Sequence, residues 1–270
     1  MSDRILIELG DDGVADVRLN RPEKMNALDS AMFEALADAG HQLAETPGLR
    51  AAVLSGEGRA FCAGLDFASF QATTEPGAKP TRNLLDRPDG TPANFAQSAA
   101  WVWRELPVPV VAAIHGVAYG GGLQIALGAD IRIVTPDARL SVRELHWGLI
   151  PDMSATQTLR QLVRLDVARE LTYTARIVSG EEAVELGLAT RCDASPRAAA
   201  FTVAREIAAH SPDAVRAAKQ LLSEATVGSV EDGLLLEERL QLTLLGSPNQ
   251  IEAVKANMEK RPPRFTDLER

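Results

Sequence analysis

The segment AIHGVAYGGGLQIALGADIRI, residues 113–133, decides the fold class of this 270-residue chain. An apolar run over 108–116 predicts a buried strand, three glycines then open a short helix, and IRIVT at 131–135 predicts the next strand. Strand, helix and strand in such quick succession indicate an α/β core. The glycines also raise a chemical question, because the first polar residue after them is Gln124, whose amide forms hydrogen bonds but cannot act as a base.

The flanking sequence extends this pattern in both directions. Before the glycines we expect a hairpin, a capped helix and a buried strand, in the order 5–19, 30–46 and 51–56. After them, a strand is expected at 139–142 and a short one near 189–192, and the chain from 196 to 260 is almost entirely helical in pattern.

Two large regions follow from this distribution. Residues 1–195 are expected to form the core that carries the site, and residues 196–270 a helical oligomerisation region. Segment 233–245 is apolar around most of its circumference, which indicates packing on two sides. Residues 67–99 are rich in Pro, Thr and Gly without periodicity and are expected to form a lid-like insertion or to be disordered.

Composition excludes several classes of function. The net charge is −9 and no basic run occurs, which argues against nucleic acid and anionic membranes as partners. No stretch approaches the ~18 apolar residues of a membrane span, and the N-terminus lacks the apolar part of a signal peptide. Two cysteines, Cys62 and Cys192, are too few for a disulfide framework, so a cytoplasmic, reduced protein is expected.

Common catalytic motifs are absent from the sequence, but two glycine turns remain. There is no serine-hydrolase elbow, phosphate loop, zinc motif or CxxC pair, so no metal site is expected. RAFCAGLD, residues 59–66, turns at Gly64 and leaves N–H groups near Leu65, while Gly120 and Gly121 precede a helix whose first N–H groups lack partners. Two such donors that converge would form an oxyanion hole. The alternative is that both are simple tight turns.

Two acids, Glu144 and Asp152, lie in the segment LSVRELHWGLIPDMSATQTL, residues 140–159. An apolar neighbourhood raises the pKa of a carboxyl group, which suits proton transfer near neutral pH. The alternatives are an ion pair of Glu144 with Arg143 or Arg139, and a helix N-cap at Asp152.

Five collinear stretches resemble the crotonase, or enoyl-CoA hydratase/isomerase, superfamily. They are LNRPEKMNAL (19–28), GEGRAFCAGLDF (56–67), the glycine segment (113–133), ELHWGLIPDM (144–153) and EKRPPRF (259–265). The resemblance implies a crotonase-like α/β spiral of ββα turns with a C-terminal helical trimerisation region. It also implies an acyl-CoA substrate, no permanently bound cofactor, and a homotrimer or dimer of trimers.

The resemblance also assigns roles to residues. The backbone N–H groups of Leu65 and Gly121 become the two oxyanion donors for a thioester carbonyl. Further contacts with the substrate fall on Lys24, Met25, Ala27, Ala63, Gly64, Asp66, Phe67, Gly120 and Phe265, with Phe265 often reaching the nucleotide end from a neighbouring subunit.

This sequence departs from the family's hydratases at the acids. Those enzymes use two glutamates to hold and deprotonate water; Glu144 matches the second of them, and Gln124 occupies the place of the first. Dienoyl-CoA isomerases add an aspartate eight residues after that glutamate, where Asp152 stands, but they also carry an Asp at the Gln124 position.

We therefore expect double-bond isomerisation of an enoyl- or dienoyl-CoA in fatty acid metabolism, with Glu144 as principal base or acid and Asp152 as its partner. Two alternatives stay open. One is a hydratase in which Gln124 orients the water, and the other is an acyl-CoA-binding scaffold without catalysis.

Overall fold

The computed structural model describes residues 4–66, 68, 71 and 83–267 of the chain. The predicted N-terminal hairpin is confirmed, with β1 (Ile5–Leu9) antiparallel to β2 (Val14–Leu19). After the one-turn helix η1 (Pro22–Lys24), the predicted helix forms as α1 (Ser30–Ala44), and Asp29 caps it by accepting the Met32 N–H at 2.8 Å.

A six-stranded sheet forms the centre of the molecule, in the order β1-β2-β3-β4-β6-β9. Its later strands are parallel to β2 and have these bounds: β3 (Ala51–Gly56), β4 (Val110–Ile114), β6 (Ile131–Val134) and β9 (Arg191–Cys192). Because side chains alternate along a strand, Ala52 and Leu54 face one cluster of the core while Ala51 and Val53 face another. Both faces of β3 are buried, which explains its continuous apolar run.

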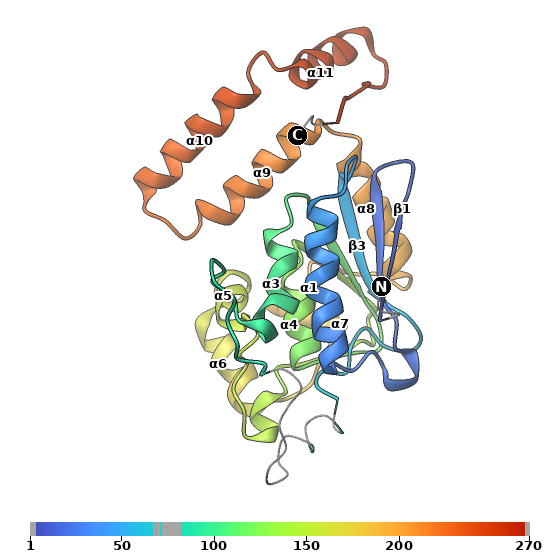
Figure 1. Ribbon diagram of the computed structural model, residues 1–270, viewed down its shortest axis with the longest axis vertical. Coiled ribbons are helices and arrows are strands. Elements are labelled where there is room, and N and C mark those ends of the chain that lie inside the picture. Colours follow the sequence, from blue (N-terminus) through green and yellow to red (C-terminus); the bar gives the residue numbers. More distant parts are fainter. Residues whose placement is uncertain (1–3, 67, 69–70, 72–82, 268–270) are drawn as a thin grey trace.

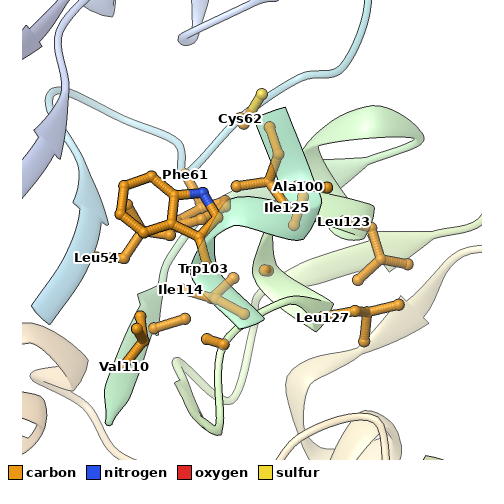
Figure 2. Packing of buried hydrophobic residues seen from close by; sticks show 14 of the residues in the cluster. Leu54, Phe61, Cys62, Ala100, Trp103, Val110, Ile114, Leu123, Ile125 and Leu127 are labelled. Carbon is orange, nitrogen blue, oxygen red and sulfur yellow. The ribbon is translucent and has the colours of Figure 1, made fainter. Parts of the chain in front are cut away.

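Helices cover the two faces of this sheet (Figure 1). α1 and α3 (Phe95–Glu105) pack against one another over one face, together with α4 (Gly121–Leu127). Figure 2 shows Trp103 of α3 among Leu54, Phe61 and Ile114, and its indole N–H donates to Ala99 O at 3.0 Å. The opposite face is covered by α8 (Pro196–Ala208), whose small Ala200 and Ala204 allow close contact.

A second, three-stranded sheet makes the fold a spiral. Its strands are β5 (Val117–Tyr119), β7 (Arg139–Ser141) and β8 (Val178–Ser179), in that order. The chain passes from β4 in the large sheet to β5 in the small one and then into α4, and it repeats the step from β6 to β7 before the short helix η2 (Glu144–Trp147). These are the expected ββα turns. The chain then forms α5 (Ala155–Leu162), α6 (Leu165–Thr174) and α7 (Gly180–Leu186).

The last three helices form an arm that projects from the core (Figure 1). They are α9 (Pro212–Glu224), α10 (Val230–Leu244) and α11 (Pro248–Glu259). Buried Lys219 ties α9 to the core, because its Nζ donates to Trp103 O at 3.1 Å, Val108 O at 2.9 Å and Asp130 Oδ2 at 2.9 Å. A groove of about 1080 Å³ lies between the arm and the core.

The structure bears on the limits of two segments predicted from the sequence, the helical C-terminal region and the insertion at 67–99. The expected boundary at 195/196 falls before α8, which packs on the sheet, so the helices that leave the core begin with α9. Of the expected lid-like insertion at 67–99, residues 67, 69–70 and 72–82 lie outside the described residues, and its last part is the start of α3, with Asn94 as the cap.

Candidate active site

Three successive turns of the spiral end at the same edge of the small sheet. Cys62 bridges to Ala118 in parallel orientation, and Ala118 in turn pairs with Leu140. Parallel strands in register present their carboxyl ends together, and ligands bind at such ends in α/β folds. The residues that follow each of these three positions are therefore brought to one place.

A pocket of about 240 Å³ opens at this edge. It contains Leu65, Gly121 and Glu144, three of the residues predicted from the sequence, and its full lining is Ala63, Gly64, Leu65, Tyr119, Gly120, Gly121, Arg143, Glu144, Trp147 and Leu149. The structure thus brings together the two glycine turns and the principal acid.

The first turn directs the Leu65 N–H away from the neighbouring strand segment. Leu28 donates to Gly64 O at 2.8 Å and accepts from the Asp66 N–H at 2.9 Å, so the intervening Leu65 N–H points to the other side. Among the described residues this N–H has no acceptor. Gly64 has φ +85°, and a Cβ placed on it would lie 2.6 Å from Tyr119 O, so only glycine fits here.

The second turn supplies the Gly121 N–H at the start of α4, where helix N–H groups have no internal partner. A Cβ on Gly64 would lie 3.8 Å from Gly121 N, so the two turns are neighbours. Packing requires glycine at this turn, because a Cβ on Gly121 would lie 2.7 Å from Met153 Sδ and one on Gly122 would lie 2.4 Å from Cys62 O.

Glu144 has a buried carboxylate of which one oxygen is hydrogen-bonded and the other is not. Glu144 is 8% exposed. Its Oε1 accepts from Gln124 Nε2 at 2.6 Å, and its Oε2 has no partner among the described residues. Burial raises the pKa of Glu144, and the charge of Asp152 raises it further, against hydrogen bonds from its own backbone N–H and Gln124 that lower it. The alternative of an ion pair with Arg143 or Arg139 is not found in the described part of the chain.

Gln124 connects Glu144 to the next loop. It is 2% exposed, and its Oε1 accepts from the backbone N–H of Met153 at 2.8 Å and of Ala155 at 3.1 Å. The hydratase alternative gives this amide the role of orienting water; in the structure it donates directly to the Glu144 carboxylate. A glutamate side chain could accept the same two N–H groups, but it could not donate to Glu144 unless protonated.

Asp152 immediately precedes Met153 in the same loop. It lines a neighbouring pocket of about 520 Å³, together with Gln97, Trp101 and Ser154, and not the pocket of Glu144. The alternative reading of Asp152 as a helix cap is wrong, because α5 begins at Ala155 with Ser154 at the cap position. Partial burial raises the pKa of Asp152, although the residue stays exposed at the surface.

The segment 24–27 runs along the first turn. Met25 O accepts the Ala63 N–H at 2.9 Å; Lys24 is exposed beside it and Ala27 is buried. Sequence reasoning missed Asn26, which is fully buried and whose Nδ2 donates to the carbonyl oxygens of Glu57, Ala60 and Phe61. Met25 and Asn26 both have positive φ. Asparagine is enriched at such positions, so an asparagine in a turn is the sequence signal that could have identified Asn26.

The remaining predicted residues are placed differently. Asp66 is bound at 2.6 Å by Arg21 Nη1; burial alone would raise its pKa, but the hydrogen bonds from Arg21 and the Ala68 N–H lower it. Phe67 lies outside the described residues. Phe265 is not brought to the pocket within one chain. The residues beside it in the sequence bind Glu252 and Asn249 of α11, and Asp267 binds Arg50. Arg50 precedes β3, at the end of that strand opposite to the pocket.

Comparison with known proteins agrees with this architecture. The sequence model of the enoyl-CoA hydratase/isomerase family matches residues 10–268. A putative enoyl-CoA hydratase/isomerase of Bacillus subtilis, YngF, is 33% identical over 97% of this chain and 97% of its own. A peroxisomal Δ(3,5)-Δ(2,4)-dienoyl-CoA isomerase of Arabidopsis thaliana is 33% identical over 96% of this chain and 94% of its own. The crystal structure of an enoyl-CoA hydratase from Bacillus anthracis superposes with a TM-score of 0.88, at 30% identity, over 97% of this chain and 98% of that one.

The chain belongs to the enoyl-CoA hydratase/isomerase family and has the crotonase fold, which confirms the resemblance read from its sequence. Over the residues that the structure describes, no helix combines the length and apolarity needed to cross a membrane. Within the same residues, no cluster of His, Cys, Asp and Glu has the form of a metal site.

Proposed function

We propose that this protein isomerises the double bond of an unsaturated acyl-CoA thioester, with Glu144 as the group that moves the proton. The observation that carries the proposal is the 2.6 Å contact between Gln124 Nε2 and Glu144 Oε1. At this place an amide and one carboxylate face each other, whereas the two-glutamate hydration route needs two acids around a water. One carboxylate is enough to remove a proton and return it.

The thioester carbonyl would bind between the Leu65 and Gly121 N–H groups. Both groups lack acceptors among the described residues, and both line the pocket that contains Glu144. Backbone donors at a helix start are fixed in advance of the reaction, so they stabilise the enolate oxygen without reorganisation.

The proton transfer would start at the unpartnered Glu144 Oε2. In a 3-enoyl-CoA, Oε2 takes a proton from C2, the C–H electron pair forms a C1–C2 double bond, and the carbonyl π pair moves onto the thioester oxygen to give a dienolate. When the carbonyl re-forms, the C1–C2 pair becomes the C2–C3 double bond, and the former C3–C4 pair takes the proton that Glu144 returns to C4. The raised pKa of Glu144 suits both halves of this transfer.

Coenzyme A would bind along segment 24–27, beside the first turn, with exposed Lys24 near the phosphates. We also propose that the protein assembles as a homotrimer or a dimer of trimers through the arm, because α10 exposes Leu234, Leu235 and Leu242 to between 57% and 64%. Phe265 would then contact the substrate of a neighbouring subunit. Light scattering of the purified protein measures the assembly directly.

The test of the reaction is the product formed from separate 2-enoyl-, 3-enoyl- and 3,5-dienoyl-CoA substrates. We expect the 3-enoyl-CoA to give a conjugated product of unchanged mass, seen as a rise in ultraviolet absorbance. A product heavier by one water would contradict isomerisation and favour the hydratase alternative. Binding of all three without turnover would favour the scaffold.

A second candidate is a dienoyl-CoA isomerase that uses Asp152 as a second proton carrier. Two observations favour it: the charge of Asp152 acts on Glu144, and dienoyl-CoA isomerases are among the relatives. For this reaction, Asp152→Asn should stop turnover of the 3,5-dienoyl-CoA and spare the 3-enoyl-CoA. If both substrates keep their rates, Asp152 carries no proton.

A further inference from the structure

Arg143 is the one cationic side chain in the described lining of the Glu144 pocket. Its guanidinium carbon lies 6.0 Å from the centre of the Tyr119 ring, and its Nη1 donates to Ala175 O at 3.1 Å. These two contacts hold the side chain along the pocket wall. Tyr119 lines the same pocket, so the guanidinium is fixed beside the space that a ligand would occupy.

Most of the donors of Arg143 remain available. A guanidinium has five N–H groups, and only Nη1 has an acceptor among the described residues. No carboxylate of the described chain forms an ion pair with Arg143, although Glu144 is the next residue. Arg21, on the other side of the first turn, contrasts with it, because Arg21 is bound by Asp66 at 2.6 Å.

The position of Arg143 limits which part of a substrate can meet it. Arg143 lines the same pocket as Leu65, Gly121 and Glu144, where the proposed function places the thioester carbonyl and the reacting carbons. At about 240 Å³, this pocket is smaller than the roughly 300–1,000 Å³ of typical ligand pockets. The partner of Arg143 therefore belongs to the acyl part of the substrate.

We propose that Arg143 selects short acyl-CoA thioesters whose acyl chain ends in a carboxylate. The proposal rests on the proposed function for the position of the thioester between Leu65 and Gly121. The planar guanidinium is suited to bidentate binding of a carboxylate, which an ammonium group cannot match. Trp147 and Leu149 provide apolar walls for the carbon chain. Glu144 is the one carboxylate of the described lining, and its charge opposes the bound anion.

Saturated esters test the proposal without turnover. Binding of glutaryl-CoA and valeryl-CoA, which have equal acyl carbon numbers and differ in a terminal carboxylate, is compared by calorimetry for the wild type and Arg143→Met. We expect the wild type to bind glutaryl-CoA at least tenfold more tightly, and Arg143→Met to bring the two affinities within about twofold. Arg143→Lys should keep part of the preference. Arg139→Met removes an exposed arginine from the start of β7 and should leave it unchanged.

Three results would overturn the proposal. They are equal wild-type affinities for the two esters, an equal loss for both esters and free coenzyme A in Arg143→Met, and a preference that survives in that variant. The second result would place the guanidinium on the coenzyme A moiety. If Arg143→Met does not fold by circular dichroism, Arg143→Lys and Arg143→Gln decide. Isomerisation of neutral 3-pentenoyl-CoA reports separately on the proposed function, so the two can fail independently.

Discussion

The two walls of the Glu144 pocket are built in different ways. One wall is backbone, formed by the Gly64 turn and the start of α4, which are packed so closely that a Cβ on Gly64 or Gly121 would overlap its neighbours. The other wall is made of side chains, with Glu144 held by Gln124 and Gln124 held by the loop before α5. The backbone wall follows from local chain geometry, whereas the side-chain wall depends on three segments that meet only in the folded protein.

The walls also differ in their energetics. The backbone N–H groups at Leu65 and Gly121 lie at the pocket surface, where water can bind them before substrate arrives. Glu144 is a carboxyl group in a buried position, and its Oε2 has no partner among the described residues. Burying a charge without full compensation costs free energy, so the side-chain wall is the part of the site that works against folding.

The largest effect is expected from removing the acid and keeping its shape. Glu144→Gln can still accept the Gln124 hydrogen bond, but it cannot take a proton. We expect kcat for a 3-enoyl-CoA to fall by about 10²–10⁴, the range for losing a general base, with little change in acyl-CoA affinity. Steady-state kinetics and calorimetry measure the two quantities. Exposed Glu185→Gln on α7 is the matched control, and a Glu144→Gln enzyme at full rate would refute the mechanism.

The next effect tests the backbone wall. Gly64→Ala would place a Cβ 2.6 Å from Tyr119 O, so the turn must shift and move the Leu65 N–H. We expect kcat to fall by about 10²-fold, as for losing one oxyanion donor. Gly90→Ala is a matched control because Gly90 has a similar φ of +79° and nothing within 4 Å of its Cβ position. Equal effects of the two substitutions would mean that only backbone strain matters.

The backbone wall is also the part of the site that sequence predicts best. Gly64, Gly120 and Gly121 each mark a turn or helix start, and their order along alternating strands and helices indicated the α/β core. The β3 and β4 strands were predicted at nearly their observed limits because continuous apolar runs report burial on both faces. Local patterns of this kind are set by neighbours in the chain.

The side-chain wall could be predicted only in part. Glu144 and Gln124 were identified from the sequence, but their direct hydrogen bond, the role of Met153 and Ala155 N–H as partners, and the separation of Asp152 into another pocket all depend on long-range packing. Asn26 was missed for the same reason, since its three carbonyl acceptors lie more than thirty residues away in the chain.

A smaller effect is expected from changing one atom of the Gln124 side chain. Gln124→Glu can still accept from Met153 and Ala155, but it places an oxygen where a donor faced Glu144 at 2.6 Å. The two acids must then share a proton, so the acidic limb of kcat/KM should move to higher pH and the rate at pH 7 should fall about tenfold. A pH profile on a 3-enoyl-CoA measures this. Gln97→Glu, which changes an amide lining the other pocket, is the control.

The same variant tests the hydratase alternative. If Gln124 orients water in this protein, a second carboxylate at position 124 should increase water addition to crotonyl-CoA. If Glu144 works alone, as proposed, hydration should not increase. An unshifted acidic limb would show that Gln124 does not set the proton affinity of Glu144.

The smallest effect is expected on stability. Substitution in the side-chain wall should stabilise the protein at high pH, whereas substitution in the backbone wall should destabilise it. Burial raises the pKa of Glu144 above its ordinary 4.5, so the folded state binds this proton more tightly than the unfolded state does. The free energy of unfolding therefore decreases as pH rises through the folded-state pKa. Glu144→Gln has no proton to lose, so at pH 8 it should be more stable than the wild type by on the order of 1 kcal/mol, or about 2–4 °C in Tm. Below pH 4.5 the difference should vanish.

Thermal unfolding at pH 8 and at the lowest pH that keeps the protein folded measures this difference, with Glu185→Gln as the control. Gly64→Ala should lose stability at every pH, because its cost is steric and not electrostatic. A Glu144→Gln protein that is less stable than the wild type at pH 8 would mean that the Gln124 contact compensates the buried charge in full. In that case both walls would favour folding, and the contrast between them would lie only in how they are encoded.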